Sequence, residues 1–144
     1  MIIGEHGDTE VPVWSSLNIG GLNLDGASKG DRWTLSEKDK ESIYEETKTA
    51  AYKIIEKKGA TYYAIALSLA RICEAILKDQ KSILPVSSYV ENYRGIDGVC
   101  LGIPSIVGRG GVEEVLPIQL NPDEEKQLQH SAKKLKEFLG EIGF

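Results

Sequence analysis

The sequence predicts an α+β fold in which an antiparallel sheet packs with long helices. Short β-like stretches come first, two long helical stretches follow, and strands separated by turns then precede a last helix. Strands and helices that are segregated in this order favour an antiparallel sheet over a doubly wound parallel one. The chain has 144 residues, which is the size of one domain with a substantial core.

The opening segment holds the arrangement that looks built for chemistry, a histidine between two glycines. Ile2 and Ile3 lead into Gly4, and His6 is followed by Gly7. Glycines permit turns and let a ligand approach the backbone closely. An imidazole titrates near neutrality, so it both takes and gives a proton there. From spacing alone, a polar turn after a short apolar strand is the commoner interpretation.

The following segments predict a strand, a turn and a loop. Residues 11–19 are rich in β-formers, and Gly20-Gly21 ends them. Residues 23–33 carry two glycines with several Asp, Asn and Ser residues, which predicts a loop or a short hairpin.

Two helices are predicted in the middle of the chain. Ser36-Glu37-Lys38-Asp39 is an approximate capping box, so the first helix begins there. Its apolar positions recur at helical spacing, which predicts one buried face formed by Ile43, Thr47, Ala50, Ala51, Ile54 and Ile55. Gly59 interrupts the pattern. The second helix, residues 61–78, is apolar on most sides, which predicts burial nearly all round.

The remaining residues predict a sheet and a helix that covers it. Residues 82–90 contain Pro85, which fits an edge strand or a strand start, and residues 92–98 form a turn. Residues 99–107 and 112–120 form an antiparallel hairpin. Asn121 and Pro122 begin the last helix. Its apolar stripe places it on the sheet and consists of Leu128, Ala132, Leu135, Leu139 and Ile142.

Composition and charge exclude several classes of function. The net charge is −5, from 22 acidic and 17 basic residues with no basic run, which argues against nucleic acid and anionic membranes as partners. The longest mainly apolar stretch, residues 60–77, is interrupted by charges and predicts no membrane span. No leader peptide pattern opens the chain, which favours the cytoplasm. Cys73 and Cys100 lie in apolar segments and are predicted to be buried, unpaired thiols.

Four parts of the sequence resemble the L-lactate dehydrogenases of the lactate/malate dehydrogenase superfamily. They are Gly-Glu-His-Gly-Asp-Thr-Glu-Val-Pro-Val-Trp-Ser at residues 4–15, Lys-Gly-Ala-Thr at 58–61, Gly-Ile-Pro at 102–104, and the final helix. Malate dehydrogenases usually carry Gly-Gly-His-Gly-Asp, so Glu5 and Trp14 favour the lactate branch.

The resemblance covers essentially the whole chain but only the second half of the family. No Gly-x-Gly-x-x-Gly follows a strand, so there is no dinucleotide fingerprint. The resemblance therefore implies a C-terminal catalytic and substrate domain over residues 1–144. It also implies that the N-terminal NAD-binding domain is absent, with no Rossmann domain in this chain.

The resemblance implies a role for three residues and a cofactor. His6 is the acid–base that interconverts L-lactate and pyruvate, with NAD as the coenzyme. Thr61 lines the substrate pocket near the carboxylate, and Ile65 packs near the nicotinamide ring. From the residues alone, Thr61 is interpreted as a helix cap after Gly59, and Ile65 as an ordinary core isoleucine.

Other catalytic groups lie upstream in the family. They are an aspartate that orients the histidine, an arginine that binds the substrate carboxylate, and a mobile loop that closes over the substrate. Negligible activity is therefore predicted for these residues alone. The expected partners are a small 2-hydroxy or 2-keto acid and like subunits, which form a tetramer in the intact family.

Four alternatives remain open. A metal site built from Glu5, His6 and Asp8 is disfavoured because no second ligand cluster appears, and His130 is predicted on the solvent side of the last helix. The chain is alternatively a non-catalytic assembly module or a truncated remnant. It is also compatible with half of a malate-type dehydrogenase, because discrimination among 2-hydroxy acids depends largely on the upstream loop.

Overall fold

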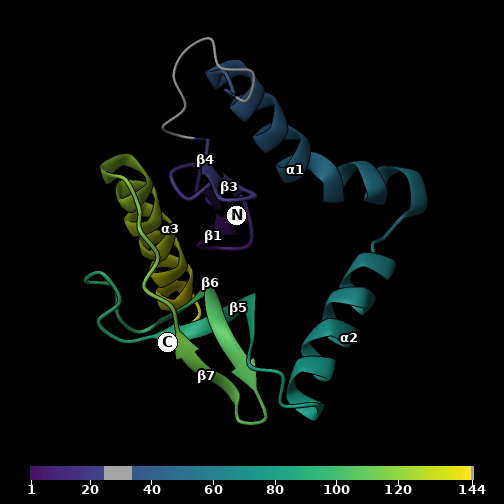
Figure 1. The fold of residues 1–144 in the computed structure, drawn as a ribbon, viewed down its shortest axis with the longest axis vertical. Helices are drawn as coiled ribbons and strands as arrows, with labels where there is room; N and C mark the ends of the chain where they lie inside the picture. The colour runs from purple at the N-terminus through teal and green to yellow at the C-terminus, as the bar shows by residue number, and fades with distance from the viewer. Residues whose placement is uncertain (25–33, 144) are drawn as a thin grey trace.

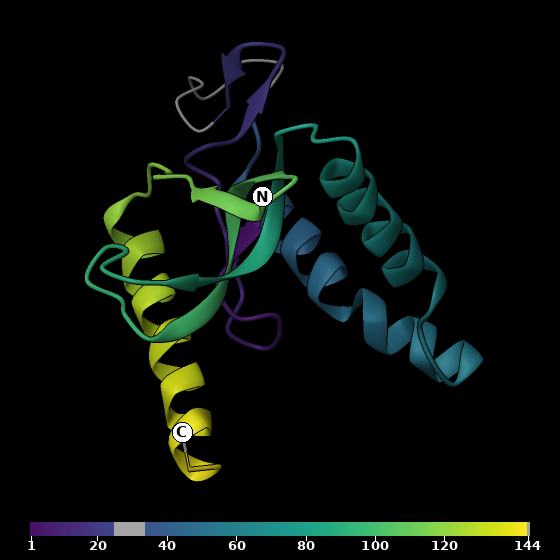
Figure 2. The same ribbon diagram turned by 90° about the horizontal axis from the view of Figure 1, so that it is seen from below.

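The computed structural model of the chain describes residues 1–24 and 34–143. Its central element is a three-stranded sheet in the order β5-β6-β7, formed by Ser82–Val90, Val99–Gly108 and Gly111–Val115. The helix α3, Pro122–Glu141, lies on one side of this sheet. The helices α1, Glu37–Lys58, and α2, Tyr63–Leu77, lie on the other side (Figures 1 and 2). Every strand pair in the described residues is antiparallel, so the predicted α+β class is confirmed.

The first 24 residues form two small antiparallel ribbons. The strand β1, Ile2–Ile3, pairs with β2, Val11–Pro12, and β3, Asn18–Ile19, pairs with β4, Leu22–Asn23. The strand predicted over residues 11–19 is therefore irregular, and only its two ends pair. Gly20 and Gly21 make the predicted turn. The loop predicted over residues 23–33 falls mostly outside the described residues.

The strand β6 is paired along both of its edges. β5 pairs with it from Ser82 to Val90, which puts Pro85 on an edge strand as predicted. On the other edge, β7 pairs with the far half of β6, and Gly102 bridges to Gly4. The strand predicted over residues 112–120 ends at Val115, because the chain leading out of β1 takes the next part of this edge.

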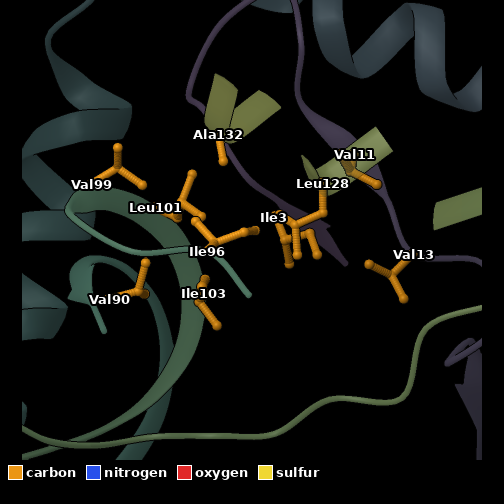
Figure 3. Close-up of a cluster of buried hydrophobic side chains, with 10 residues drawn as sticks. All are labelled: Ile3, Val11, Val13, Val90, Ile96, Val99, Leu101, Ile103, Leu128 and Ala132. Atoms are coloured by element: carbon orange, nitrogen blue, oxygen red, sulfur yellow. The ribbon is translucent and has the colours of Figure 1, made fainter. Parts of the chain in front are cut away.

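The core lies where β1, β2, β6 and α3 meet. Figure 3 shows the converging side chains of Ile3, Val11, Leu101 and Leu128, each no more than 2% exposed. Ala132 is 3% exposed and comes from the same face of α3 as Leu128. Leu135 and Leu139 are partly buried against this cluster, whereas Ile142 is 70% exposed. The predicted stripe of α3 is thus confirmed except at its last position.

The helices α1 and α3, which both have an N-terminal capping box, begin where the sequence predicts. Ser36 caps α1, because its side chain accepts from the Asp39 amide and the Asp39 carboxylate accepts from the Ser36 amide. Asn121 and Glu124 make the same reciprocal arrangement at the start of α3. Gly59 ends α1 at a φ of 78°, in the left-handed region where a glycine is favoured.

The predicted burial of α1 and α2 is wrong for this chain. No residue of α1 is buried, and Ala75 is the one buried residue of α2. Leu67 and Leu77 are 73% and 79% exposed. The apolar spacing identifies the helices correctly, but the described residues include no element that packs over these faces.

The two cysteines are unpaired as predicted, yet both are exposed. Cys73 lies on α2 and Cys100 on β6. Their predicted burial is wrong for two reasons. Nothing among the described residues covers α2 around Cys73. Cys100 alternates with the buried Val99 and Leu101 and therefore lies on the opposite face of β6. Within the described residues, no helix is long and apolar enough to cross a membrane.

Candidate active site

The histidine singled out by the sequence lies in a loop, residues 4–10, that we call the His6 loop. It connects β1 to β2 and begins at the point where the chain leaves the edge of β6. Gly4 is buried and has a φ of +93°, so the chain turns sharply there in a conformation that favours glycine. The His6 side chain is exposed. The loop thus presents its imidazole to solvent from a buried base.

Two elements hold the base of the His6 loop. The Gly4 amide donates to the Gly102 carbonyl at 2.9 Å, and the Gly102 amide donates to the Gly4 carbonyl at 2.8 Å. One residue later, the Glu5 amide donates to the Ser131 hydroxyl of α3 at 2.7 Å. The backbone on the N-terminal side of His6 is therefore fastened to both β6 and α3.

The Glu5 side chain braces the loop from within. Its carboxylate accepts from the Thr9 amide at 3.1 Å and also from the Thr9 hydroxyl. The Glu10 amide donates to the Gly7 carbonyl at 3.3 Å, which closes the turn. Glu5 is therefore turned toward its own loop.

The helix α1 holds the far side of the loop through two side chains. The Tyr44 hydroxyl donates to the Glu10 carbonyl at 3.0 Å, and Lys48 Nζ donates to the Asp8 carbonyl at 3.1 Å. Burial raises the pKa of the Tyr44 hydroxyl above its ordinary value. Tyr44 therefore remains a neutral donor at neutral pH. These contacts give α1 a link to the loop although none of its residues is buried.

The chain that follows β2 is tied to the beginning of α3. The Ser15 amide donates to Glu124 Oε1 at 2.9 Å, and the Ser15 hydroxyl donates to Glu124 Oε2. Glu124 is 4% exposed and also accepts from the Asn121 amide at 2.9 Å. A buried carboxylate needs such donors, because unpaired burial of a charge is costly. One residue thus caps α3 and fixes the segment beyond the His6 loop.

The imidazole faces a cleft of about 700 Å³ between the sheet, α2 and α3. His6 contributes from the loop and Ile65 from α2, so the structure brings these two predicted site residues to one cavity. Leu69 extends the apolar wall of α2, Gly102 forms part of the floor on β6, and Leu135 contributes from α3. The cleft is mainly apolar, with an ionisable group at one end, as ligand sites usually are.

The described lining of the cleft includes an imidazole but no cationic side chain that could bind an anion. Among the described residues that line it, none is lysine or arginine, and the ionisable ones are Glu5, His6 and Cys100. Within residues 1–24 and 34–143, no group of three His, Cys, Asp or Glu side chains is placed to hold a metal ion. These residues can exchange a proton with a bound hydroxyl or carbonyl group, but they do not grip a carboxylate.

The third predicted site residue, Thr61, is not part of the cleft wall. It is exposed in the turn between α1 and α2, four residues before Ile65. Its interpretation as a helix cap is wrong, because the cap residue of α2 is Tyr62 and no side chain caps the helix. Ile65 is 59% exposed, so it is not a core isoleucine in this chain either.

The sequence did not identify the residues that hold the loop. Ser131 lies among the core-facing residues of α3, close to Leu128 and Ala132 on the helix surface. A polar residue on an apolar face is a signal, because buried polar groups are almost always hydrogen-bonded. Tyr44 and Lys48 give no comparable signal, since an exposed helix carries many such residues.

Comparison with known proteins places this architecture in a family. Residues 1–142 match the family described as lactate/malate dehydrogenase, alpha/beta C-terminal domain. The L-lactate dehydrogenase of Oceanobacillus iheyensis is 48% identical over 136 residues, which are 94% of this chain and 42% of that protein. The chain therefore spans less than half the length of this curated relative.

Two solved structures superpose on nearly the whole chain. The minor L-lactate dehydrogenase of Enterococcus mundtii matches with a TM-score of 0.92 and 38% identity, over 99% of this chain and 45% of that one. The malate dehydrogenase of Salinibacter ruber matches with a TM-score of 0.83 and 36% identity, over 99% and 45%. The chain thus belongs to the lactate/malate dehydrogenase family and corresponds to its alpha/beta C-terminal domain.

Proposed function

We propose that this chain is the catalytic and substrate-binding half of an NAD-dependent L-lactate dehydrogenase, in which His6 donates and accepts the proton. The observation that carries the proposal is the His6 loop. An exposed imidazole stands at one end of an apolar cleft, on a backbone fastened to β6, α3 and α1. A proton-transfer group needs this combination of access and fixed position.

The reaction divides between the coenzyme and this chain. Oxidation of L-lactate removes a hydride from carbon and a proton from the hydroxyl group. NAD would supply the hydride acceptor. His6 accepts the proton, and in the reverse direction it returns that proton to the carbonyl oxygen of pyruvate.

The residues present fit one part of NAD. Ile65 and Leu69 give the cleft an apolar wall suited to the flat nicotinamide ring. The cleft lining described above offers no cation for the phosphates, and the described strands form no parallel, dinucleotide-binding sheet. Ile65 is accordingly the coenzyme-contacting residue in this proposal. Thr61 lies in the turn before α2 and is absent from the cleft lining; its proposed contact with the substrate carboxylate rests on the family resemblance alone.

The proposal predicts negligible activity for the chain alone. A substrate carboxylate needs a cationic partner, and bidentate hydrogen bonds from an arginine bind carboxylates strongly. The described cleft has none. Productive turnover therefore requires groups from a coenzyme-binding partner domain. The same chemistry leads us to propose a cytoplasmic location, where a soluble coenzyme is available and both thiols stay reduced.

Two observations favour alternative functions. The close superposition on a malate dehydrogenase favours a malate-type substrate for the same acid–base. The exposed apolar residues of α2 favour a non-catalytic module that assembles with like subunits, since large apolar patches mark protein interfaces.

The test is pyruvate-dependent oxidation of NADH by the purified chain. It is measured alone and then mixed with the separately expressed coenzyme-binding half of a related L-lactate dehydrogenase, with oxaloacetate as the competing substrate. We expect activity only in the mixture, with preference for pyruvate and loss in His6→Ala. Activity with oxaloacetate only would favour the malate-type alternative. Co-purification without activity would favour the assembly module.

A further inference from the structure

Ser131 on α3 lies against the His6 loop from the core side. It is 0% exposed, and 126 positions of sequence separate it from Glu5, whose amide it accepts at 2.7 Å. A serine inside a helix commonly bonds back to its own helix or faces solvent. Here its hydroxyl instead accepts a hydrogen bond from the backbone amide of a distant segment.

The same hydroxyl also contacts the hydrogen-bonded side chains of Glu5 and Thr9 inside the loop, through Thr9. Thr9 Oγ1 lies 3.4 Å from Ser131 Oγ and also donates to the Glu5 carboxylate. The backbone of Glu5 and the side chain of Thr9 therefore meet at one point on α3, and the Glu5 carboxylate is linked to that point through Thr9. His6 lies between Glu5 and Thr9, so both ends of the segment that carries the imidazole are held from this point.

The backbone approaches Ser131 as closely as it does because position 4 lacks a side chain. A Cβ built on Gly4 would lie 2.7 Å from Ser131 Oγ, which is closer than real Cβ contacts occur. Gly4 is at the same time paired in both directions with Gly102. The loop base is thus fixed between a strand on one side and the serine on the other.

We propose that Ser131 is a positioning residue for His6, which sets the orientation of the imidazole in the cleft through the Glu5 amide and the Thr9 hydroxyl. This inference rests on the proposed role of His6 in proton transfer. The physical reason is that the Glu5 amide lies one residue before His6, so a shift there moves the backbone that carries the imidazole. A misplacement of about 1 Å costs a catalytic group roughly 100-fold in rate.

The variant Ser131→Ala removes the hydroxyl with little change in volume. Ser88→Ala is the matched control, because Ser88 is 4% exposed and bonds Ser105 at 2.9 Å, without touching the loop. Thr9→Val is a second variant that keeps the shape of the side chain and removes only its hydroxyl. It remains informative if Ser131→Ala folds poorly.

Two readouts separate positioning from general stability. The first is hydrogen exchange of the Glu5 amide in the 144-residue chain by NMR, together with the His6 ring signals, using His130 as the internal reference. The second is the rate of the mixed enzyme described above, divided into kcat and KM. Loss of a positioning contact lowers kcat per folded molecule. Loss of folding lowers only the number of active molecules.

We expect Ser131→Ala to speed Glu5 exchange, to shift the His6 signals and to lower kcat about tenfold with KM unchanged. Thr9→Val should do the same to a smaller extent, and Ser88→Ala should leave kcat and the His6 signals as they are. The proposal is overturned if Ser131→Ala matches Ser88→Ala in kcat or leaves Glu5 exchange unchanged. If His6→Ala keeps full activity instead, the proposed function fails and the role of Ser131 fails with it.

Discussion

Gly4 is the residue on which the geometry of the His6 loop most depends. Its φ of +93° and the 2.7 Å approach of Ser131 Oγ to its missing Cβ give it two separate reasons to be glycine. Gly111 has a similar φ of +87° but nothing within 4 Å of its missing Cβ. The two positions therefore separate the cost of backbone conformation from the cost of crowding.

We expect Gly111→Ala to lower the free energy of unfolding by about 1–2 kcal/mol, the usual cost of a left-handed alanine. Gly4→Ala should lower it by a further ~1 kcal/mol or more, because the loop must also move away from Ser131. Urea unfolding of both variants measures the difference. Equal losses would show that the approach of Ser131 to Gly4 places no steric demand on the loop.

Glu10, at the end of the His6 loop, carries a carboxylate in an unfavourable setting. Its Oε1 atom is buried and has no hydrogen-bond partner among the residues described. Burial raises the pKa of Glu10 above its ordinary 4.5, and the nearby charges of His6 and Lys48 offset part of this effect. A raised folded-state pKa means that Glu10 favours folding when protonated, and that this contribution is lost as pH rises through that pKa.

The variant Glu10→Gln should therefore gain melting temperature over the parent chain as pH rises. The gain is expected to be small near about pH 4, where Glu10 is largely protonated, and larger near about pH 7. Thermal unfolding across this range measures it. A difference in melting temperature that does not change with pH would contradict the expectation that burial destabilises the ionised form of Glu10.

At the residue scale, the sequence predicted what its local pattern contains and missed what distant segments supply. His6 could be singled out because glycines flank it and the longer string resembles a known family. Ser131 shows in sequence only as a polar residue on an apolar helix face, and its partner Glu5, at the other end of the chain, cannot be identified from that pattern. The Thr61 cap was predicted from its place after Gly59, but the turn continues one residue further, so Tyr62 is the cap residue and Tyr63 begins the helix.

At the scale of elements, α1 and α3 have the same kind of cap and different surroundings. Each begins with a reciprocal capping box, at Ser36 and at Asn121. α3 places Leu128 and Ala132 in the core, whereas α1 has no buried residue. The stability of α3 is thus coupled to the whole fold, while α1 is held mainly by its contacts with the His6 loop.

Asn121→Ala is expected to lower the global free energy of unfolding by about 1 kcal/mol, as loss of an N-cap usually does. Ser36→Ala removes an equivalent cap but should appear as fraying of the first turn of α1, with little effect on global unfolding. Denaturant unfolding and amide exchange in the two first turns distinguish these effects. Equal global losses would mean that α1 is part of the cooperative core.

The sequence predicted element types well, because caps and periodicity are local. It predicted the extent of β7 and the burial of α1 and α2 badly, because both depend on neighbours. The edge of β6 is divided between β7 and Gly4, which no pattern within residues 112–120 reveals. Apolar spacing shows which helix face is suited to burial but not whether anything covers it.

At the scale of the whole molecule, the fold has one packed side and one open side. The packed side joins α3 to the sheet around the core in Figure 3. The open side carries the exposed apolar residues of α2, including Tyr63, Leu67 and Leu77, which are 77%, 73% and 79% exposed. The order of strands and helices predicted this architecture, since the class depends on element order more than on details of packing.

The open side predicts self-association of the isolated chain. Exposed apolar patches of this kind drive association in water. Leu67→Lys should therefore shift the chain toward monomer in sedimentation velocity over a concentration series. Ile142→Lys is the control, because Ile142 is 70% exposed at the end of α3, on the other side of the sheet from α2 (Figure 2). Equal sedimentation of the parent chain and Leu67→Lys at all concentrations would contradict this expectation.

The central claim is that His6 is the acid–base of a lactate dehydrogenase. Its most direct test replaces the matching segment of the Oceanobacillus iheyensis enzyme with this chain and compares His6→Gln with His130→Gln, the chain's only other histidine. We expect kcat/KM for pyruvate to fall by at least ~100-fold in His6→Gln and to stay unchanged in His130→Gln, since general acid–base groups contribute about that much. Equal activity of the two variants would contradict the account.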